Sequence, residues 1–355
     1  MKILVIQQKM IGDVLATSIL FEAIKHKYPK AELHYVINSH TFPVVKNNPF
    51  IDYFHFFTPE HEKSKFQLYK FAKDLNKQNF DVVIDVYSKL SSKLMTFLSK
   101  AKTKISIDKG KKSFIYTHTF KHKSKAHTNA GLAIENRLQL LKPLDIDALK
   151  IVRPKIYLTE DEKNNAKQFL ESSAIDLENP LFMIGVLGSG HNKTYPFEYM
   201  AKVIDQIVLE HPTSQILFNY IPKQEADAKA ILELCSPETQ KHIYFDVFGK
   251  SLRDFLAITS HCDALIGNEG GAINMAKALY IPTFTIFSPW IKKEAWNMFD
   301  DNIKYVSVHL KDYDNKPYLN IEHPKVLKSK ATELYLDFKP AFFESNLKAF
   351  LKRLH

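Results

Sequence analysis

The sequence predicts an α/β protein made of two doubly wound parallel sheets. Short apolar segments alternate with longer amphipathic segments through both halves of the chain, which is typical of parallel strands joined by helices. The alternation is interrupted between residues 145 and 180, so it forms two separate units. A length of 355 residues also suits two domains.

In the first half, each strand is expected to lead into a helix, giving a parallel sheet covered on both faces. The predicted strands are residues 3–6, 33–37, 53–57, 82–86 and 104–107. The predicted helices are residues 14–26, 63–76, 91–98 and 129–140. We assign residues 1–160 to this N-terminal domain.

The second half starts after a helix-start signal at Thr159, which opens a predicted helix over residues 160–172. The predicted strands that follow are residues 182–186, 215–220, 243–245, 264–266, 283–287 and 304–306. The predicted helices are residues 197–210, 223–234, 252–260 and 272–279. We assign residues 161–335 to a C-terminal domain. Residues 336–355 should form a basic amphipathic helix, which could lie on a membrane but is expected to pack back on the protein.

The composition is that of an ordinary globular protein, with 45% hydrophobic and 25% charged residues. No apolar run approaches the ~18 residues that span a membrane, and the start of the chain reads as a strand, not as a signal peptide. Two cysteines, Cys235 and Cys262, do not suggest a disulfide framework. The expected location is therefore the reducing cytoplasm.

The net charge of +10 comes almost entirely from lysine, because only four of the 49 basic residues are arginine. Base readout favours arginine, so nucleic acid is not an expected partner. Between residues 100 and 125 there are nine lysines and one acid, Asp108. This stretch is either a solvated loop or a cradle for an anionic acceptor at the membrane surface, with Lys109, Lys111 and Lys112 as candidate contacts.

The turn from Gly267 to Gly271 is the most informative motif, since it joins a predicted buried strand to a predicted helix. Its glycines let a ligand approach the backbone closely. The free N–H groups and the dipole of the helix start favour an anion such as phosphate. Asn268 and Glu269 add polar groups, so the turn predicts a site for the phosphates and sugar of a nucleotide-linked donor.

Three further loops follow predicted strands. Ser189 and Lys193 lie among small residues before a helix, and they either contact a diphosphate or belong to a capped turn with a surface lysine. Glu225 either accepts hydrogen bonds from a ribose or simply stabilises a helix start. Asp13, after Gly12, is either an N-terminal helix carboxylate or a general base. Ligands of such folds bind at the carboxyl ends of the strands, so the predicted active site is the cleft between the two domains. The sequence shows no metal-ligand cluster.

Four of these segments together resemble glycosyltransferase family 9, the lipopolysaccharide heptosyltransferases and their relatives. They are residues 2–17, which include Gly12 and Asp13, then residues 80–85, 192–196 and 249–282. The four similarities occur in the family's order and spacing. The resemblance implies a GT-B architecture, in which two Rossmann-like domains face a central cleft. It also implies an inverting transfer, without metal or cofactor, from a nucleoside diphosphate sugar such as ADP-heptose. The implied acceptor is an acidic glycolipid of the lipopolysaccharide-core type, at the inner face of the inner membrane.

The resemblance also implies roles for particular residues. Asp13 matches the catalytic base. The matching donor contacts are Ser189 and Lys193 for the diphosphate, Glu225 for the ribose, Glu269 for a sugar hydroxyl, and Gly271 and Ala272 for the helix-start amides. Three positions depart from the family pattern: Glu269 replaces Asp, Gly270 replaces Thr, and Asn274 replaces His. These positions belong to the donor site, so the sugar is left open. A nucleotide-sugar epimerase or hydrolase, and a binding protein without turnover, are the alternatives.

Overall fold

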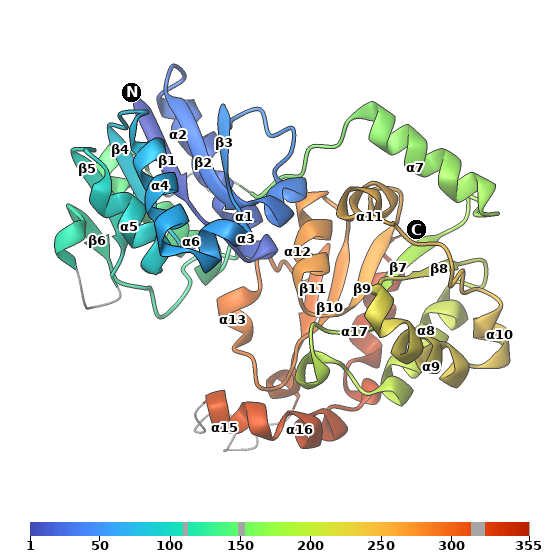
Figure 1. Ribbon diagram of the computed structural model, residues 1–355. Coiled ribbons are helices and arrows are strands. Elements are labelled where there is room, and N and C mark those ends of the chain that lie inside the picture. Colours follow the sequence, from blue (N-terminus) through green and yellow to red (C-terminus); the bar gives the residue numbers. More distant parts are fainter. Residues whose placement is uncertain (109–112, 148–152, 314–323, 355) are drawn as a thin grey trace. The chain divides into compact units, whose positions relative to one another are not determined.

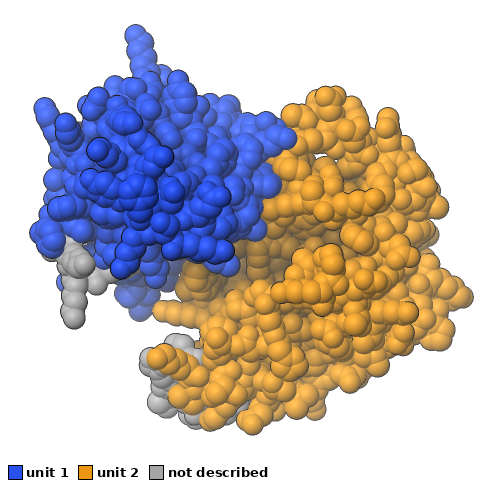
Figure 2. Space-filling model, in the orientation of Figure 1, with its two compact units in different colours: residues 1–157 blue, residues 158–355 orange. Residues whose placement is uncertain are grey.

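The computed structural model describes residues 1–108, 113–147, 153–313 and 324–354. The chain divides into two compact units, Met1–Tyr157 and Leu158–His355, which Figure 2 distinguishes by colour. Each unit contains a parallel sheet with helices, which confirms the predicted α/β class. No helix in the described ranges combines the length and apolar character needed to cross a membrane.

Unit 1 is built on a six-stranded sheet in which all neighbouring strands are parallel (Figure 1). The strands are β1 (Lys2–Ile6), β2 (Glu32–Asn38), β3 (Tyr53–Phe57), β4 (Val82–Asp85), β5 (Thr103–Ile107) and β6 (His118–Phe120). Their order is β3-β2-β1-β4-β5-β6. Because the direction of winding reverses at β1, the loop after β1 lies at the switch point where such sheets bind ligands.

Short helices surround this sheet. They are α1 (Ile11–Thr17), α2 (Ile19–Lys27), η1 (Ser39–Val44), α3 (Pro59–Lys63), α4 (Lys65–Asn76), α5 (Leu90–Leu98), η2 (Ser113–Ile115), α6 (Leu132–Leu138) and η3 (Gln139–Leu144). Helices α4 and α5 pack against each other. Both bury one side in the same apolar cluster, through Ala72 and Leu75 on α4 and Met95 on α5.

Unit 1 departs from the predicted elements in several places, of which three have a local cause. The predicted helix over residues 14–26 is two helices, because Ser18 interrupts it and its hydroxyl donates to the Leu15 carbonyl oxygen at 2.7 Å. The predicted helix over residues 63–76 is also divided, because Lys63 ends α3 and α4 begins at Lys65. Ser64 caps α4, and its side chain accepts a hydrogen bond from the Gln67 N–H. Strand β6 was not predicted, since its three residues lie within a stretch of polar and basic residues.

Unit 2 contains a five-stranded parallel sheet. Its strands are β7 (Leu181–Gly185), β8 (Gln215–Phe218), β9 (Ala264–Asn268), β10 (Thr283–Ile286) and β11 (Tyr305–Val308). Their order is β11-β10-β9-β7-β8, so the winding reverses between β7 and β9. The predicted strand over residues 243–245 is wrong, because this segment forms only a single bridge, from Ile243 to Ile216, and then turns back on itself.

The helices of unit 2 cover both faces of its sheet. They are α7 (Glu160–Ser172), η4 (His191–Lys193), α8 (Phe197–Glu210), η5 (Pro222–Gln224), α9 (Glu225–Leu234), α10 (Pro237–Gln240), α11 (Leu252–Thr259), α12 (Gly271–Ala278), α13 (Lys293–Trp296), η6 (Leu310–Asp312), α15 (Pro324–Ser329), α16 (Ala331–Asp337), η7 (Pro340–Phe342) and α17 (Glu344–Leu351). Helix α17 packs on unit 2 itself and buries Leu347, Phe350 and Leu351 in the apolar core.

Both cysteine thiols are buried, and burial raises the pKa of Cys235 to about 12 and that of Cys262 above its ordinary value.

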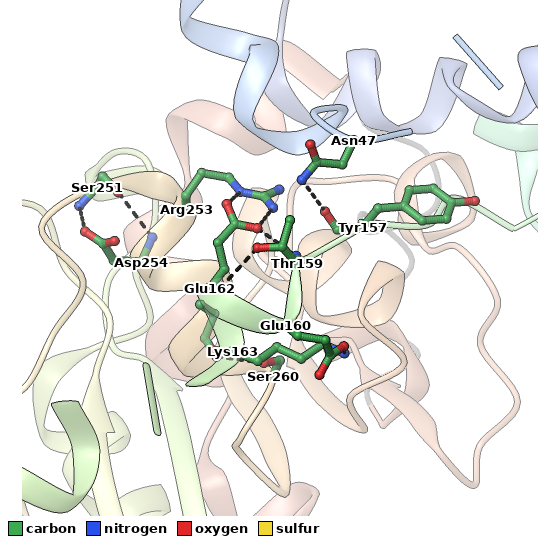
Figure 3. A network of polar contacts seen from close by, with 11 residues as sticks. Asn47, Tyr157, Thr159, Glu160, Glu162, Lys163, Ser251, Arg253, Asp254 and Ser260 are labelled. Carbon is green, nitrogen blue, oxygen red and sulfur yellow. Dashed lines mark hydrogen bonds and ion pairs between the residues drawn. The ribbon is translucent and has the colours of Figure 1, made fainter. Parts of the chain in front are cut away.

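The first helix of unit 2 is fixed by an ion pair (Figure 3). Thr159 and Glu162 form the predicted reciprocal cap at the start of α7, with N–H···O distances of 2.9 and 3.1 Å. The carboxylate of Glu162 also accepts two hydrogen bonds from Arg253 at the start of α11, one of them at 2.8 Å from Nε. One glutamate therefore both caps α7 and holds it against α11.

Candidate functional site

The candidate donor site of unit 2 lies where the loops after β7 and β9 meet. These strands are neighbours, with Gly185 opposite Gly267. Gly267 has a φ of +137°, and a Cβ atom there would lie 2.4 Å from the Gly185 carbonyl oxygen. Only glycine fits such a close approach in this conformation. The glycine that opens the predicted turn is therefore required by the packing of the two strands.

Asn268, the last residue of β9, joins the two loops. Its Nδ2 donates to the carbonyl oxygens of Gly185 and Val186, both at 2.9 Å. Its Oδ1 accepts from the Tyr195 N–H at 2.8 Å. The side chain of Asn268 is buried and its polar atoms are used in these hydrogen bonds. Asn268 therefore positions the loop that carries Lys193, whereas the sequence suggested a polar group that contacts the ligand.

Lys193 and Glu269 form an ion pair in this site. The Lys193 Nζ lies 3.3 Å from Oε1 of Glu269, whose side chain is only 8% exposed. That distance defines an ion pair, but the Oε1 atom accepts no hydrogen bond from the described residues. Burial raises the pKa of Glu269, while Lys193 opposes this shift. A buried oxygen without a hydrogen bond is costly, so Oε1 is suited to accept one from a ligand hydroxyl.

The loop after β10 contacts both Lys193 and the main chain of the residue before it. The Trp290 Nε1 donates to the Asn192 carbonyl oxygen at 2.7 Å, and the Ser288 hydroxyl donates to the same oxygen at 2.9 Å. The Trp290 ring centroid lies 5.8 Å from Nζ of Lys193 and 5.3 Å from Nζ of Lys328. Two ammonium groups thus share one aromatic ring, which concentrates positive charge near Lys193.

The start of α12 supplies further positive potential. Gly270, with a φ of +154°, precedes the helix, which begins at Gly271. The first hydrogen bond of the helix runs from the Asn274 N–H to the Gly270 carbonyl oxygen at 3.3 Å. The amides of residues 271–273 precede that bond and have no partner within the helix. The structure thus contains the helix start on which the predicted anion site depends, and binding of an anion there stays a prediction.

The side chains of the other predicted donor contacts are not joined to the ion pair. Ser189 is exposed in the loop after β7, Glu225 is exposed as the first residue of α9, and Asn274 is half-buried in the first turn of α12. Over the described ranges, none of these three side chains bonds to Lys193 or Glu269. The loops before α8 and α9 are connected instead by Gln224, whose Nε2 donates to the Gly188 carbonyl oxygen at 3.0 Å.

In unit 1, the predicted base Asp13 is held by an arginine. Asp13 lies in the first turn of α1, and its Oδ1 is 2.6 Å from Nη2 of Arg137 on α6. The buried guanidinium also donates from Nε to the Thr17 hydroxyl at 2.9 Å and from Nη1 to the Ala133 carbonyl oxygen at 2.7 Å. Oδ2 of Asp13 accepts a long hydrogen bond from the Met10 N–H at 3.5 Å, which leaves it capacity for a further hydrogen bond.

Sequence reasoning missed Arg137, Trp290 and Lys328. Arg137 could have been found from its rarity, because an arginine among so many lysines indicates a position that needs a planar guanidinium. Trp290 is likewise one of only two tryptophans. The candidate acceptor contacts Lys109, Lys111 and Lys112 lie outside the described residues. In the part of the chain that is described, no three His, Cys, Asp or Glu side chains group as a metal site would require.

Comparison with known proteins shows the family and the fold of this chain. The sequence model of glycosyltransferase family 9 (heptosyltransferase) matches residues 68–325. Lipopolysaccharide heptosyltransferase 1 of Campylobacter coli is 23% identical over 292 residues, which cover 81% of this chain and 84% of that protein. A family 9 glycosyltransferase of Veillonella parvula superposes with a TM-score of 0.74 at 18% identity, covering 95% of this chain and 97% of the other. An E. coli heptosyltransferase solved with ADP superposes with a TM-score of 0.67 at 17% identity, covering 94% of this chain and 100% of the other. These structures share the fold, which confirms the predicted GT-B architecture.

Proposed function

Because the chain belongs to glycosyltransferase family 9, we propose that it transfers heptose from a nucleoside diphosphate sugar, ADP-heptose, to an acceptor of the lipopolysaccharide-core type. The names of its relatives support this choice of sugar and acceptor. ADP as the nucleotide is supported by the E. coli heptosyltransferase solved with it.

The observation that carries the proposal is the Lys193–Glu269 ion pair beside the start of α12. Lys193 and the amides of Gly271 and Ala272 would hold the diphosphate, whose charge grows as the bond to the sugar breaks. Oε1 of Glu269 would accept a hydrogen bond from a sugar hydroxyl. Lys193 is still partly exposed and so can reach the diphosphate, while its buried partner Glu269 faces the sugar in this proposal.

Residues outside the ion pair complete the proposed donor site. Ser189 would donate to a phosphate oxygen, and Glu225 would accept from the ribose hydroxyls. Gly270 and Asn274 occupy the positions where the chain departs from the family pattern, and they would shape the space for the sugar. Positive charge comes from Lys193 and the helix start, so we propose a transfer that needs neither metal nor cofactor.

The proposed reaction is a single displacement at the anomeric carbon. Oδ2 of Asp13 takes the proton of an acceptor hydroxyl as its oxygen forms the new glycosidic bond. The bond between the anomeric carbon and the diphosphate oxygen breaks on the opposite side, so the configuration inverts. The electron pair leaves with the nucleoside diphosphate. Arg137 keeps Oδ1 of Asp13 occupied and so directs Oδ2 to the acceptor.

We propose an acidic glycolipid at the cytoplasmic face of the inner membrane as the acceptor. Lysines between residues 100 and 125, with Lys109, Lys111 and Lys112 among them, would attract its phosphates or carboxylates.

A transfer assay tests the proposal. The protein is incubated with ADP-heptose, or with GDP- and UDP-sugars as controls, and with a heptose-free core acceptor. Mass spectrometry should detect an acceptor enlarged by one heptose, and NMR of the new linkage should show inversion. Donor binding is followed separately by thermal shift, because a ligand of the folded state raises the melting temperature. Release of free sugar without acceptor would favour the epimerase or hydrolase alternative, and binding without any turnover would favour a binding protein.

A further inference from the structure

Two neighbouring helices of unit 1 expose large apolar side chains. Helix α4 exposes Phe66 and Tyr69, which are 71% and 47% accessible. Helix α5 exposes Leu90 and Phe97, which are 74% and 57% accessible. Both helices bury their opposite sides in the apolar cluster of unit 1, which leaves these four side chains exposed to solvent.

The spacing of these residues gives each helix an apolar stripe. Phe66 and Tyr69 are three positions apart, and Leu90 and Phe97 are seven apart, so each pair lies on one side of its helix. Phe114 in η2, a segment that contacts α5, is 77% exposed. We call Phe66, Tyr69, Leu90, Phe97 and Phe114 the α4–α5 surface. Groups of large exposed apolar residues on a folded protein mark sites of interaction.

Lysine predominates around the α4–α5 surface, although the adjoining α3 carries exposed Glu60 and Glu62, the latter paired with Lys9. Residues 86–107, which contain α5 and β5, hold five lysines and no aspartate or glutamate. Lys89, Lys100 and Lys102 are exposed. Helix α4 adds exposed Lys70 and Lys73, and its one acid, Asp74, is paired with Lys77 at 2.7 Å. The partner of this surface should therefore be apolar and anionic.

We propose that the α4–α5 surface docks unit 1 on an anionic lipid bilayer. Aromatic and leucine side chains would enter the interfacial region, while the lysines around them would contact anionic headgroups. A bilayer fits both observations, because it offers apolar depth beneath a negatively charged surface. The proposal rests on the proposed function only in that a glycolipid acceptor would be reached from such a membrane.

Vesicle sedimentation tests this docking. The full chain is mixed with vesicles of phosphatidylglycerol and phosphatidylethanolamine, or with neutral phosphatidylcholine vesicles. The wild-type protein should bind the anionic vesicles at least about tenfold more strongly, and this preference should weaken with salt. The double variant L90S/F97S should lose about tenfold in binding to anionic vesicles. The control L209S/L234S changes two exposed leucines of unit 2 and should bind like wild type.

The readouts separate docking from folding and from catalysis. L90S/F97S should keep the wild-type melting temperature and its affinity for ADP, and it should keep its transfer rate on a soluble, lipid-free acceptor. Equal binding to neutral and anionic vesicles, or full binding by L90S/F97S, would overturn the docking. A concentration-dependent dimer that L90S/F97S abolishes would also overturn it, because a second copy would then occupy the surface. Vesicle binding by a protein that transfers no sugar would refute the proposed function alone.

Discussion

The Lys193 ammonium lies 3.3 Å from the carboxylate of Glu269, and the two residues come from the loops after neighbouring strands β7 and β9. The sequence placed both residues in a donor site but did not indicate that they form an ion pair. The pair has a consequence for mutagenesis. Removing the lysine takes a cation from the ligand and also leaves a buried carboxylate without its partner.

We expect Lys193→Ala to weaken binding of the nucleoside diphosphate and to lower turnover, each by roughly tenfold to a hundredfold, because a charged hydrogen bond is lost. Calorimetry with ADP measures the affinity. The matched control is Lys202→Ala on the exposed side of α8, which should bind ADP normally. Normal ADP affinity in Lys193→Ala would remove this lysine from the donor site.

Asp13→Asn should lower turnover by about two to four orders of magnitude, the usual scale for loss of a general base. The amide oxygen can still accept from Arg137, so the fold and donor affinity should be retained. Single-turnover rates with ADP-heptose, together with ADP affinity, test both expectations. Turnover within a few-fold of wild type would show that another group takes the proton.

Transfer should continue in the presence of EDTA. Lys193 and the amides at the start of α12 provide the positive charge that a metal ion would supply to the leaving diphosphate. The initial rate is measured with the chelator and then with added magnesium. Loss of activity that magnesium restores would contradict a metal-free mechanism.

Salt should raise the KM for the acceptor more than the KM for the donor, because charges on an exposed basic stretch are screened over about 8–10 Å at ordinary ionic strength. The variant K109Q/K111Q/K112Q should have the same effect at low salt, with little change in kcat. If the acceptor KM responds to neither change, these lysines only keep the protein soluble, and the acceptor is a neutral glycan.

Acid should destabilise the protein between about pH 6.5 and pH 4. Burial lowers the pKa of His309 to about 4, although neighbouring Asp312 opposes the shift, and burial also lowers the pKa of His55 to about 4. The unfolded chain takes up these protons near pH 6.5, so it binds more protons than the folded chain until about pH 4. The contribution of the neutral histidines to stability is therefore complete above pH 6.5 and is lost as the pH falls.

Urea unfolding at pH 7 and pH 5 measures this loss. His309→Asn removes one titrating group, and asparagine can still cap η6, so the variant should lose less stability between the two pH values than wild type. An equal loss in both proteins would mean that His309 does not contribute to the pH dependence.

The sequence predicted those elements whose signals lie within a few neighbouring residues. Alternation of apolar and amphipathic segments predicted both parallel sheets, and the Thr159–Glu162 capping pattern predicted the start of α7. Residues 243–245 resembled a strand in sequence. In the structure only Ile243 pairs with β8, through a single bridge to Ile216, so no continuous ladder forms. The interruption at Ser18 depends on one side-chain hydrogen bond that competes with the helix.

The parts of the site that were missed depend on contacts between distant positions. Arg137 reaches Asp13 across 124 positions, because α6 packs against α1. Trp290 fixes the loop of Lys193 through a carbonyl oxygen of the main chain, which leaves no trace in residue type. Periodicity and motif spacing describe neighbours along the chain, so a single sequence does not reveal such pairs.

The two buried cysteines make this chain convenient for site-specific labelling. Cys235 and Cys262 are 3% and 4% exposed, and burial keeps both thiols protonated at neutral pH. A maleimide dye should therefore leave the native cysteines unmodified while it reacts with a cysteine introduced on the surface. One such cysteine in each unit would carry a donor and an acceptor fluorophore. Energy transfer between them would then report, molecule by molecule, whether ADP-heptose changes the distance between the units.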